Sequence, residues 1–486
     1  MRRMSIMQSD IRSALHPAAT FCNLNPVSLG TRPESRIAVS GPFLRVESQE
    51  LRLRLRLRSR LSLSVRASSF SSSSIVSETT VEKNPNTKPS ICTADELHYV
   101  SVANGDWTLA LWRYNPPPNA PPRNHPLLLL SGVGANAIGY DLSPGSSFAR
   151  YMSSQGYDTW ILEVRGTGLS TRAEDSKAGL SEASPAIAGQ IRDLGQRLVN
   201  IIEGQRSVSP QLFDLQERFI TTIEDFQKQL DLIVQYDWDF DNYVEEDVPA
   251  VMEYIKSQNK PKDGKLLAIG HSMGGILLYA MLSRCGVKRR DSGLTAVVTL
   301  SSSLDYTSSK SSLKFLLPLA DPVQALNVPV PLGALLAAAY PLSSRPPYVL
   351  SWLNPQISAQ DMLRPELFKK LVLNNFCTVP AKLLLQLRTA FQEGGLCDRS
   401  GTFRYKNHLH KSNVPVLALA GDRDLICPPE AVYETVKVIP QRLVAYKIFG
   451  EPHGAHYAHY DLVGGRLAAG QVYPCIIEFI NRHDWA

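Results

Sequence analysis

The chain has 486 residues, of which 44% are apolar and 20% charged, the composition of an ordinary globular protein. Its net charge of +6 is misleading, because residues 1–67 alone hold twelve arginines, no lysine and four acidic residues. The remainder carries 39 basic and 41 acidic residues, so it lacks the basic surplus of a nucleic-acid-binding protein.

Residues 1–67 are rich in Arg and Ser and poor in acids, which is typical of an organelle transit peptide. They lack the apolar core of a secretory signal. Val65-Arg66-Ala67, which precedes a serine run, resembles a plastid processing site. We therefore expect 1–67 to be a disordered transit peptide for the chloroplast, with the mitochondrion as the alternative. The polar residues 68–94 are expected to form a linker.

Strands and helices then alternate, which predicts a parallel sheet. Two short strands are expected to flank the turn Asn104-Gly105-Asp106. A fully apolar strand, a helix and another strand follow. The predicted ranges are strands His98–Ala103, Trp107–Tyr114, Pro126–Leu130 and Thr159–Val164, and helix Ser146–Gln155.

This alternation stops between residues 171 and 237. Two apolar stripes at helical spacing, one from Ile187 to Ile201 and one from Leu212 to Ile233, predict a helical insertion. Such stripes usually pack, so we interpret the insertion as additional cover for the core, with a wall of the substrate site as the alternative.

The alternation resumes, is interrupted again over 302–411, and ends at the C-terminus. The interruption is rich in Leu, Pro and Ala, and we expect a lid there. Its most apolar part, Pro322–Ser344, is broken by prolines and does not predict a membrane span. The core is thus expected to comprise 95–301 and 412–486. Its later elements are helix Tyr243–Ser257, strand Leu294–Leu300, strand Val414–Ala420, helix Glu430–Val438, strand Leu443–Phe449 and helix Val472–Asn481.

The most informative motif lies between the first part of the core and the lid. An apolar strand from Lys265 leads directly into Gly270-His271-Ser272-Met273-Gly274, and an apolar helix follows. In this G-x-S-x-G elbow the serine hydroxyl projects from a strained turn, and Gly270 and Gly274 avoid backbone clashes. The strand–turn–helix context favours a catalytic serine over a merely structural Gly-Ser turn.

A serine nucleophile needs a base and an acid, which follow it in this order: Ser, Asp or Glu, His. The strand after the lid leads into Gly421-Asp422-Arg423-Asp424. Asp424 has the usual position for the acid, and Asp422 is expected to cap the turn.

The base is expected after the next strand, where the loop holds three histidines. His453 is only four residues beyond Phe449 and is restricted by Pro452, which leaves His456 and His459. The three could also suggest a metal site, but no supporting set of Asp, Glu or Cys accompanies them. Seven scattered cysteines without a Cys-x-x-Cys pair likewise argue against zinc and against a disulfide framework.

A tetrahedral intermediate needs two backbone N–H donors. One is expected from Met273, directly after the nucleophile. The other is expected from Val133, in the small-residue loop Ser131-Gly132-Val133-Gly134 after the first parallel strand.

Several stretches together resemble the α/β-hydrolase superfamily, near its acid-lipase-like and polyhydroxyalkanoate-synthase-like branches. The matching stretches are Tyr140–Ala149, Gly156–Trp160, Arg165-Gly166, Asp247–Ala250 and His459–Gly464. The resemblance implies a mostly parallel sheet flanked by helices with a helical lid, and it identifies His459 as the family's histidine. Acid lipases have His-Gly where this chain has Ser131-Gly132. Polyester synthases have cysteine in place of Ser272, so the serine favours hydrolysis.

We therefore predict a serine hydrolase of carboxylic esters, lipid or other apolar acyl esters, that uses Ser272, Asp424 and His459 through an acyl-enzyme. Neither a cofactor nor a metal is expected. The expected partners are a small apolar ester and, through the lid, a membrane surface. Two alternatives stay open: an acyltransferase with the same triad, and a non-catalytic binding or scaffold protein on a hydrolase fold.

Overall fold

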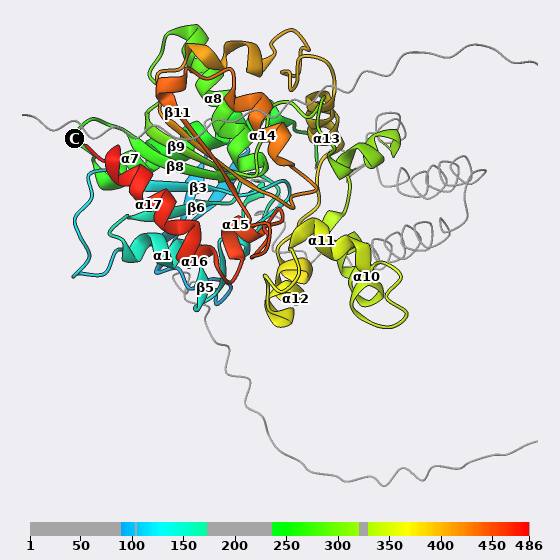
Figure 1. Cartoon of the computed structure of the whole chain (residues 1–486). Coiled ribbons are helices and arrows are strands. Elements are labelled where there is room, and N and C mark those ends of the chain that lie inside the picture. The colour runs from blue at the N-terminus through cyan, green and yellow to red at the C-terminus, as the bar shows by residue number, and fades with distance from the viewer. Residues whose placement is uncertain (1–88, 103–104, 173–235, 320–328, 486) are drawn as a thin grey trace, which may run out of the picture. The chain divides into compact units, whose positions relative to one another are not determined.

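The structure is a computed structural model, and it describes residues 89–102, 105–172, 236–319 and 329–485 (Figure 1). The chain divides into two units, Met1–Val81 and Glu82–Ala486. All described residues belong to the second. The predicted transit peptide, most of the linker and residues 173–235 of the predicted helical insertion lie outside the described residues.

The described residues form a nine-stranded sheet in the order β1-β2-β6-β3-β8-β9-β10-β11, with β7 beside β2. In this order each strand from β6 to β11 is parallel to the next one. By contrast, β1, β6 and β7 each pair antiparallel with β2. The predicted mostly parallel sheet is thus confirmed. The strands are β1 Glu96–Ser101, β2 Trp107–Tyr114, β3 Leu127–Leu130, β6 Thr159–Leu162, β7 Thr171–Arg172, β8 Leu266–His271, β9 Leu294–Leu300, β10 Val416–Gly421 and β11 Val444–Phe449. A separate hairpin joins β4 Asp141–Ser143 and β5 Ser146–Ser147.

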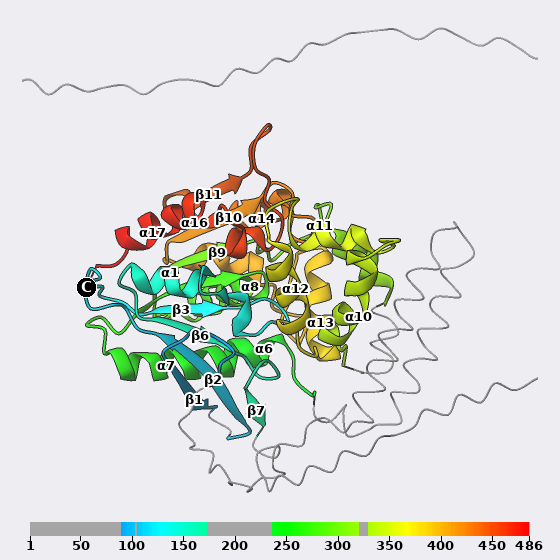
Figure 2. The same ribbon diagram turned by 90° about the horizontal axis from the view of Figure 1, so that it is seen from below.

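Helices cover both faces of this sheet. Buried side chains of α7 (Val248–Asn259), α8 (Met273–Lys288) and α14 (Pro429–Val436) share one hydrophobic cluster. Those of α1 (Phe148–Ser154) and α17 (Tyr473–Arg482) belong to another. In Figure 2, α7 and α17 accordingly lie on opposite sides of the strands.

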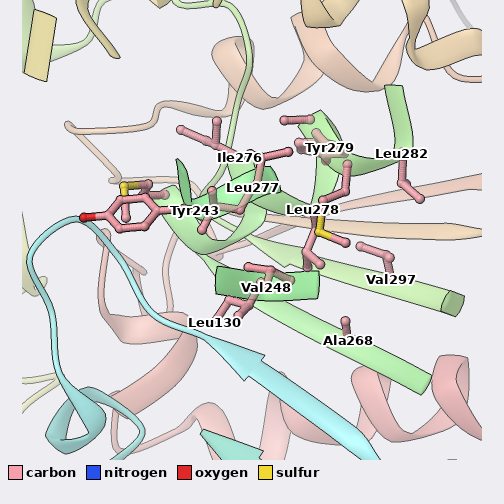
Figure 3. Close-up of a cluster of buried hydrophobic side chains, with 14 of the residues drawn as sticks. Leu130, Tyr243, Val248, Ala268, Ile276, Leu277, Leu278, Tyr279, Leu282 and Val297 are labelled. Atoms are coloured by element: carbon pink, nitrogen blue, oxygen red, sulfur yellow. The ribbon is translucent and has the colours of Figure 1, made fainter. Parts of the chain in front are cut away.

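The helix α8 is buried all round over most of its length. Every residue from Met273 to Ser283 is buried. Its side chains pack on β3, β8 and β9 at Leu130, Ala268 and Val297 (Figure 3). On another side lies a 3-10 helix, Tyr405–Lys411, whose Tyr405 carbonyl accepts the Ser283 hydroxyl at 2.8 Å. This burial anchors the turn that begins the helix.

Most predicted strands and helices begin or end one or two residues away from their bounds in the structure, and two differences have a physical cause. The predicted helix Tyr243–Ser257 begins earlier, with α6 Phe240–Asn242 and a π-helical turn Tyr243–Asp247 before α7. Asp239 caps its start through a capping box with Asn242, a signal that the apolar pattern alone does not contain. The end of the predicted linker also differs, because Cys92 and Ala94 are buried in the core.

Between β9 and β10 the chain is mainly helical, and we call residues 302–415 the β9–β10 segment. The elements of its described residues are 3-10 helices Ser312–Leu319, Ser351–Leu353, Thr389–Phe391 and Tyr405–Lys411, and helices α10 Leu332–Ser344, α11 Asn354–Ile357, α12 Pro365–Asn374 and α13 Ala381–Arg388. Its two ends, at Leu304 and Leu409, belong to the core. No helix among the described residues is long and apolar enough to cross a membrane.

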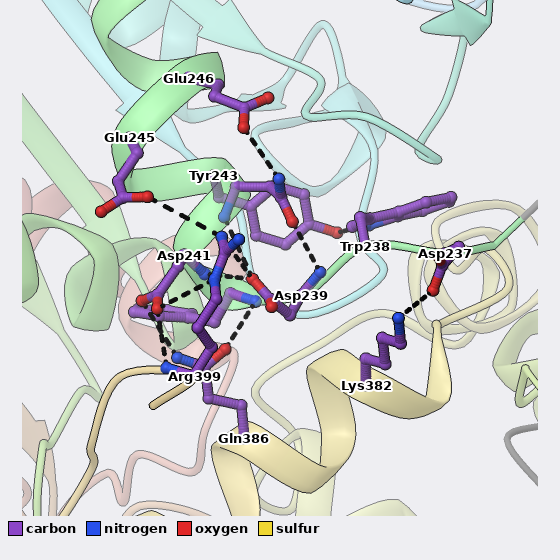
Figure 4. Close-up of polar contacts among 12 residues, drawn as sticks. Asp237, Trp238, Asp239, Asp241, Tyr243, Glu245, Glu246, Lys382, Gln386 and Arg399 are labelled. Atoms are coloured by element: carbon purple, nitrogen blue, oxygen red, sulfur yellow. Dashed lines mark hydrogen bonds and ion pairs between the residues drawn. The ribbon is translucent and has the colours of Figure 1, made fainter. Parts of the chain in front are cut away.

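Polar contacts attach this segment to the start of α6 (Figure 4). The Gln386 side chain in α13 accepts the Phe240 N–H at 3.1 Å and donates to Asp241 Oδ1 at 3.1 Å. The Arg399 N–H donates to the other oxygen of buried Asp241 at 2.8 Å. Lys382 pairs with Asp237. The middle of the β9–β10 segment is therefore held to the core by more than its two ends.

Candidate active site

Ser272 lies on a strained turn between β8 and α8. Its φ of 54° and ψ of −120° are values that residues other than glycine rarely adopt. A Cβ on Gly270 would lie 2.4 Å from the carbonyl carbon of Gly274, and one on Gly274 would lie 2.0 Å from the Leu130 oxygen. Both glycines are therefore sterically required, and the turn has the geometry of a nucleophile elbow.

The structure brings His459 and Asp424 together. The Nδ1–H of His459 donates to Asp424 Oδ2 at 2.9 Å, and the two residues are 8% and 2% exposed. The other carboxylate oxygen of Asp424 accepts the N–H groups of Ile426 at 2.9 Å and Cys427 at 2.8 Å. Because Nδ1 carries the proton, Nε2 is left as a lone pair that can accept one.

His271, which the sequence reasoning did not single out, connects this imidazole to the elbow. Its Nε2–H donates to the main-chain oxygen of His459 at 2.9 Å, and the two ring centroids are 4.9 Å apart. Burial, and then the neighbouring His459, lower the pKa of His271 to about 3. It therefore stays neutral and adds no positive charge beside the base. Its position directly before the serine was the signal in the sequence.

The competing residues Asp422 and His456 form a pair of their own. His456 Nδ1 lies 2.5 Å from Asp422 Oδ2, and Asp422 Oδ1 accepts the Tyr457 N–H at 2.9 Å. The expectation that Asp422 caps its own turn is thus wrong, because the backbone group that it holds belongs to the histidine loop. His453 is exposed. Among the described residues no cluster of His, Cys, Asp or Glu could hold a metal ion.

Of the two predicted oxyanion donors, Met273 follows the nucleophile directly, and Val133 follows a glycine that contacts it. A Cβ on Gly132 would be 3.3 Å from Ser272 Cβ, so the loop before Val133 is in contact with the serine. Met273 begins α8. Within the described part of the chain, no protein acceptor takes the N–H of Val133 or of Met273. Two free donors beside the serine can serve an oxyanion.

The β9–β10 segment is hydrogen-bonded to both loops of this site. Cys377 N–H donates to Gly134 O at 2.7 Å, and Asn136 N–H donates to Asn375 O at 2.9 Å. On the other side, Tyr460 N–H donates to Ile357 O at 2.8 Å. These contacts were not predicted. They place the segment directly against the loops that carry Val133 and His459.

The sheet edge explains how distant residues meet. Val133, Ser272, Asp424 and His459 follow the carboxyl ends of β3, β8, β10 and β11, and these ends share one edge of a parallel sheet. Ligands bind outside this edge in open α/β sheets. The arrangement of a strained serine, an oriented imidazole and free N–H donors is suited to nucleophilic acyl transfer.

Comparison with known proteins gives one family. The model of the alpha/beta hydrolase fold matches residues 125–461, and this general model does not separate the branches named above. Comparison with curated protein sequences gives no match.

Solved structures that resemble the chain include a putative aryl esterase from Burkholderia cenocepacia. It is 14% identical, the match covers 80% of this chain and 99% of that chain, and the TM-score is 0.42. A thermophilic esterase from Thermogutta terrifontis has 13% identity, 80% and 100% coverage and a TM-score of 0.45. A soluble variant of monoglyceride lipase from Saccharomyces cerevisiae has 13% identity, 83% and 100% coverage and a TM-score of 0.46. At such values these likenesses carry no information on the substrate.

Proposed function

We propose that this chain, which belongs to the α/β-hydrolase fold family, is a serine hydrolase of carboxylic esters. The observation that carries the proposal is the Asp424–His459 pair, which His271 joins to the elbow that holds the strained Ser272. Asp424 is held by two backbone N–H groups and orients the imidazole with Nε2 as the acceptor. This is the arrangement that activates a serine hydroxyl.

The reaction would run in two halves. His459 Nε2 takes the proton of Ser272 as its oxygen attacks the ester carbonyl, and Asp424 stabilises the resulting imidazolium. The N–H groups of Val133 and Met273 bind the oxyanion, and each such donor lowers the barrier by about 3 kcal/mol. His459 then protonates the leaving alcohol. Water, deprotonated by the same nitrogen, finally releases the acyl group from the serine.

The apolar character of the β9–β10 segment supports an apolar acyl chain and a role of this segment as a lid. Phe315, Leu316 and Trp352 are 85%, 55% and 54% exposed. The 3-10 helix that carries Phe315 adjoins the acid loop, because Ser312 N–H donates to Leu425 O at 2.7 Å. Exposed apolar side chains in such a place suit an apolar substrate or a membrane surface.

The test of the lid uses Leu335 and Leu336 in α10, which are half-buried. Replacing both by serine should lower kcat/KM for long acyl esters more than for short ones. An equal loss on both would indicate damaged folding and would contradict substrate contact.

The test of the chemistry is Ser272→Ala. The variant should lose ester hydrolysis and covalent labelling by a fluorophosphonate probe, while its unfolding midpoint stays near that of the wild type. Retained turnover in the purified variant would contradict the mechanism. Analysis of the products formed with an added alcohol separates hydrolysis, which gives the free acid, from acyl transfer, which gives a new ester. If the probe does not label the wild-type chain, the chain is a binding protein.

Plastid import is also part of the proposal and rests on residues 1–67, which lie outside the described residues. A fusion of these residues to a fluorescent protein should enter chloroplasts. Removal of 1–67 should leave an active enzyme, and cytosolic retention of the fusion would refute the import.

A further inference from the structure

Glu163 is a buried carboxylate that the proposed mechanism does not use. It follows the end of β6 and is 2% exposed. Among the described residues no lysine or arginine forms an ion pair with it. Burial raises the pKa of this carboxyl group, and the N–H groups of Leu169 and Ala137 and the side chain of Trp112 lower it in part. Since a buried carboxylate without a cation costs stability, its contacts call for an explanation.

The two oxygens of Glu163 hold two different loops. Oε1 accepts the N–H of Ala137 at 2.9 Å, and Oε2 accepts the N–H of Leu169 at 2.8 Å. The packing is close, because a Cβ on Gly168 would lie 2.1 Å from the carboxylate. A side chain with two acceptor oxygens and no donor is needed to hold both N–H groups at once.

Ala137 belongs to the loop of residues 131–139, which we call the oxyanion loop because it carries Val133. The loop starts from β3, which lies between β6 and β8 in the sheet. On the β8 side, Gly132 is in contact with Ser272. On the β6 side, Ala137 is held by Glu163. Val133 lies between these two points, and the Ala135 N–H to Gly132 O bond of 3.2 Å closes the turn between them. The bonds of Cys377 to Gly134 and of Asn375 to Asn136 hold the same loop from the β9–β10 segment.

We propose that Glu163 is a positioning residue for the oxyanion loop: its carboxylate holds Ala137 and thereby sets where the Val133 N–H points. The inference rests on the proposed function, because it assigns Val133 to the oxyanion. It explains why a carboxylate without a cation lies at the end of β6. This strand is the neighbour of β3, which leads into the oxyanion loop.

The test is Glu163→Gln, which keeps the shape of the side chain. Its NH₂ group must face either Ala137 or Leu169, so one N–H loses its acceptor and one loop shifts. A donor in the oxyanion hole acts in the transition state. We therefore expect kcat to fall about tenfold to hundredfold with KM nearly unchanged. The affinity for a trifluoromethyl ketone, which mimics the tetrahedral intermediate, should fall by the same factor.

Asp247→Asn is the control for a loss of stability. Asp247 is also fully buried and accepts a backbone N–H, that of Arg165 at 2.9 Å, but unlike Glu163 it also pairs with the Arg165 guanidinium, and it does not touch the oxyanion loop. We expect it to lower the unfolding midpoint and to leave kcat and ketone affinity within about threefold of wild type. A variant that only loses stability thus changes the unfolding midpoint, whereas a variant that displaces the Val133 N–H also lowers kcat and ketone affinity.

Ala137→Pro tests the same bond from the other side. Ala137 is the first residue of a 3-10 helix whose cap, Asn136, is extended at φ −98° and ψ −171°. Proline is tolerated after an extended residue at a helix start, and it removes the N–H that Glu163 accepts. The losses of kcat in Ala137→Pro and Glu163→Gln should not add in the double variant, because both remove one contact.

Three results would overturn the inference: wild-type kcat in both Glu163→Gln and Ala137→Pro, a lower unfolding midpoint with unchanged ketone affinity in both variants, or additive losses in the double variant. If Glu163→Gln does not fold, Ala137→Pro decides by the same measurements. Hydrogen exchange of residues 131–139 needs no activity, and Glu163→Gln should accelerate it whereas Asp247→Asn should not. A wild-type chain that neither hydrolyses esters nor reacts with the probe would refute the proposed function, and the exchange result would still decide the role of Glu163.

Discussion

The same two loops carry two acid–imidazole pairs, and only one of them is suited to catalysis. Asp424 lies 2.9 Å from His459, and Asp422 lies 2.5 Å from His456. If the Asp–His distance alone decided, the second pair would be taken as the catalytic one. The side chains of the first pair are 10% and 0% exposed, whereas those of the second are 32% and 24% exposed.

The difference lies in what surrounds each pair. The second oxygen of Asp424 is held by its own loop, and the backbone of His459 is held by His271, the neighbour of the nucleophile. The second oxygen of Asp422 instead holds the Tyr457 N–H in the opposite loop. The outer pair therefore fastens the two loops together, whereas the inner pair lies against His271, the residue before the proposed nucleophile. An Asp–His distance does not identify a catalytic pair without its neighbours.

The largest expected effect comes from replacing the two histidines in turn. His459→Ala should lower kcat by about 10⁴-fold or more, because the base acts as a unit with the nucleophile. His456→Ala should lower it about tenfold or less. The measurement is kcat on one ester, with the unfolding midpoint of each variant as the control. An inactive His456→Ala beside an active His459→Ala would reverse the assignment of the two pairs.

The aspartates give the second comparison. Asp424→Asn should lower kcat by about 10⁴-fold, because an amide no longer selects the tautomer in which Nε2 is free. Asp422→Asn should lower the unfolding midpoint more than kcat, since Asp422 bridges two loops. Equal kcat losses in the two variants would mean that the outer pair takes part in the chemistry.

The fold could be predicted from the sequence because its signals are local. The apolar strands are bounded by glycine and proline, and β2 and β9 have the predicted bounds. The elbow needs glycine at two fixed places, so Ser272 was recognisable from five residues. Chain order then restricted the acid to one loop and the base to the next.

The contacts that could not be predicted join residues far apart in the chain. The pairing of Cys377 with Gly134 depends on the path of the whole β9–β10 segment, which no local pattern specifies. Glu163 appears in the sequence as one acidic residue at a strand end, and only the structure shows the two N–H groups that it accepts. The role of Asp422 was misjudged for the same reason, because its partners lie 34 and 35 residues away.

The smallest effect is expected from a third carboxylate near His459, that of Asp461 at the start of α15 (Asp461–Gly464). It is fully buried, and burial raises its pKa from 3.8 to about 6. Oδ2 accepts the N–H groups of Ala359 at 2.7 Å and Ala458 at 2.8 Å, and Oδ1 accepts the Ser358 hydroxyl at 2.5 Å. It therefore ties the β9–β10 segment to the loop of His459 without touching the imidazole.

A raised carboxyl pKa means that the folded chain holds this proton more tightly than the unfolded chain. The contribution of Asp461 to stability is thus fully present below pH 3.8 and is lost as pH rises to about 6, a loss on the order of 3 kcal/mol. Asp461→Asn removes the titration and keeps the contacts, because its amide oxygen can accept both N–H groups and its NH₂ can donate to Ser358. We expect the variant to unfold at higher urea than wild type at pH 8 and at equal urea near pH 4, with kcat within about threefold. If Asp461→Asn is less stable than wild type at both pH values, the carboxylate is ionised in the folded chain, and its three hydrogen bonds outweigh its burial.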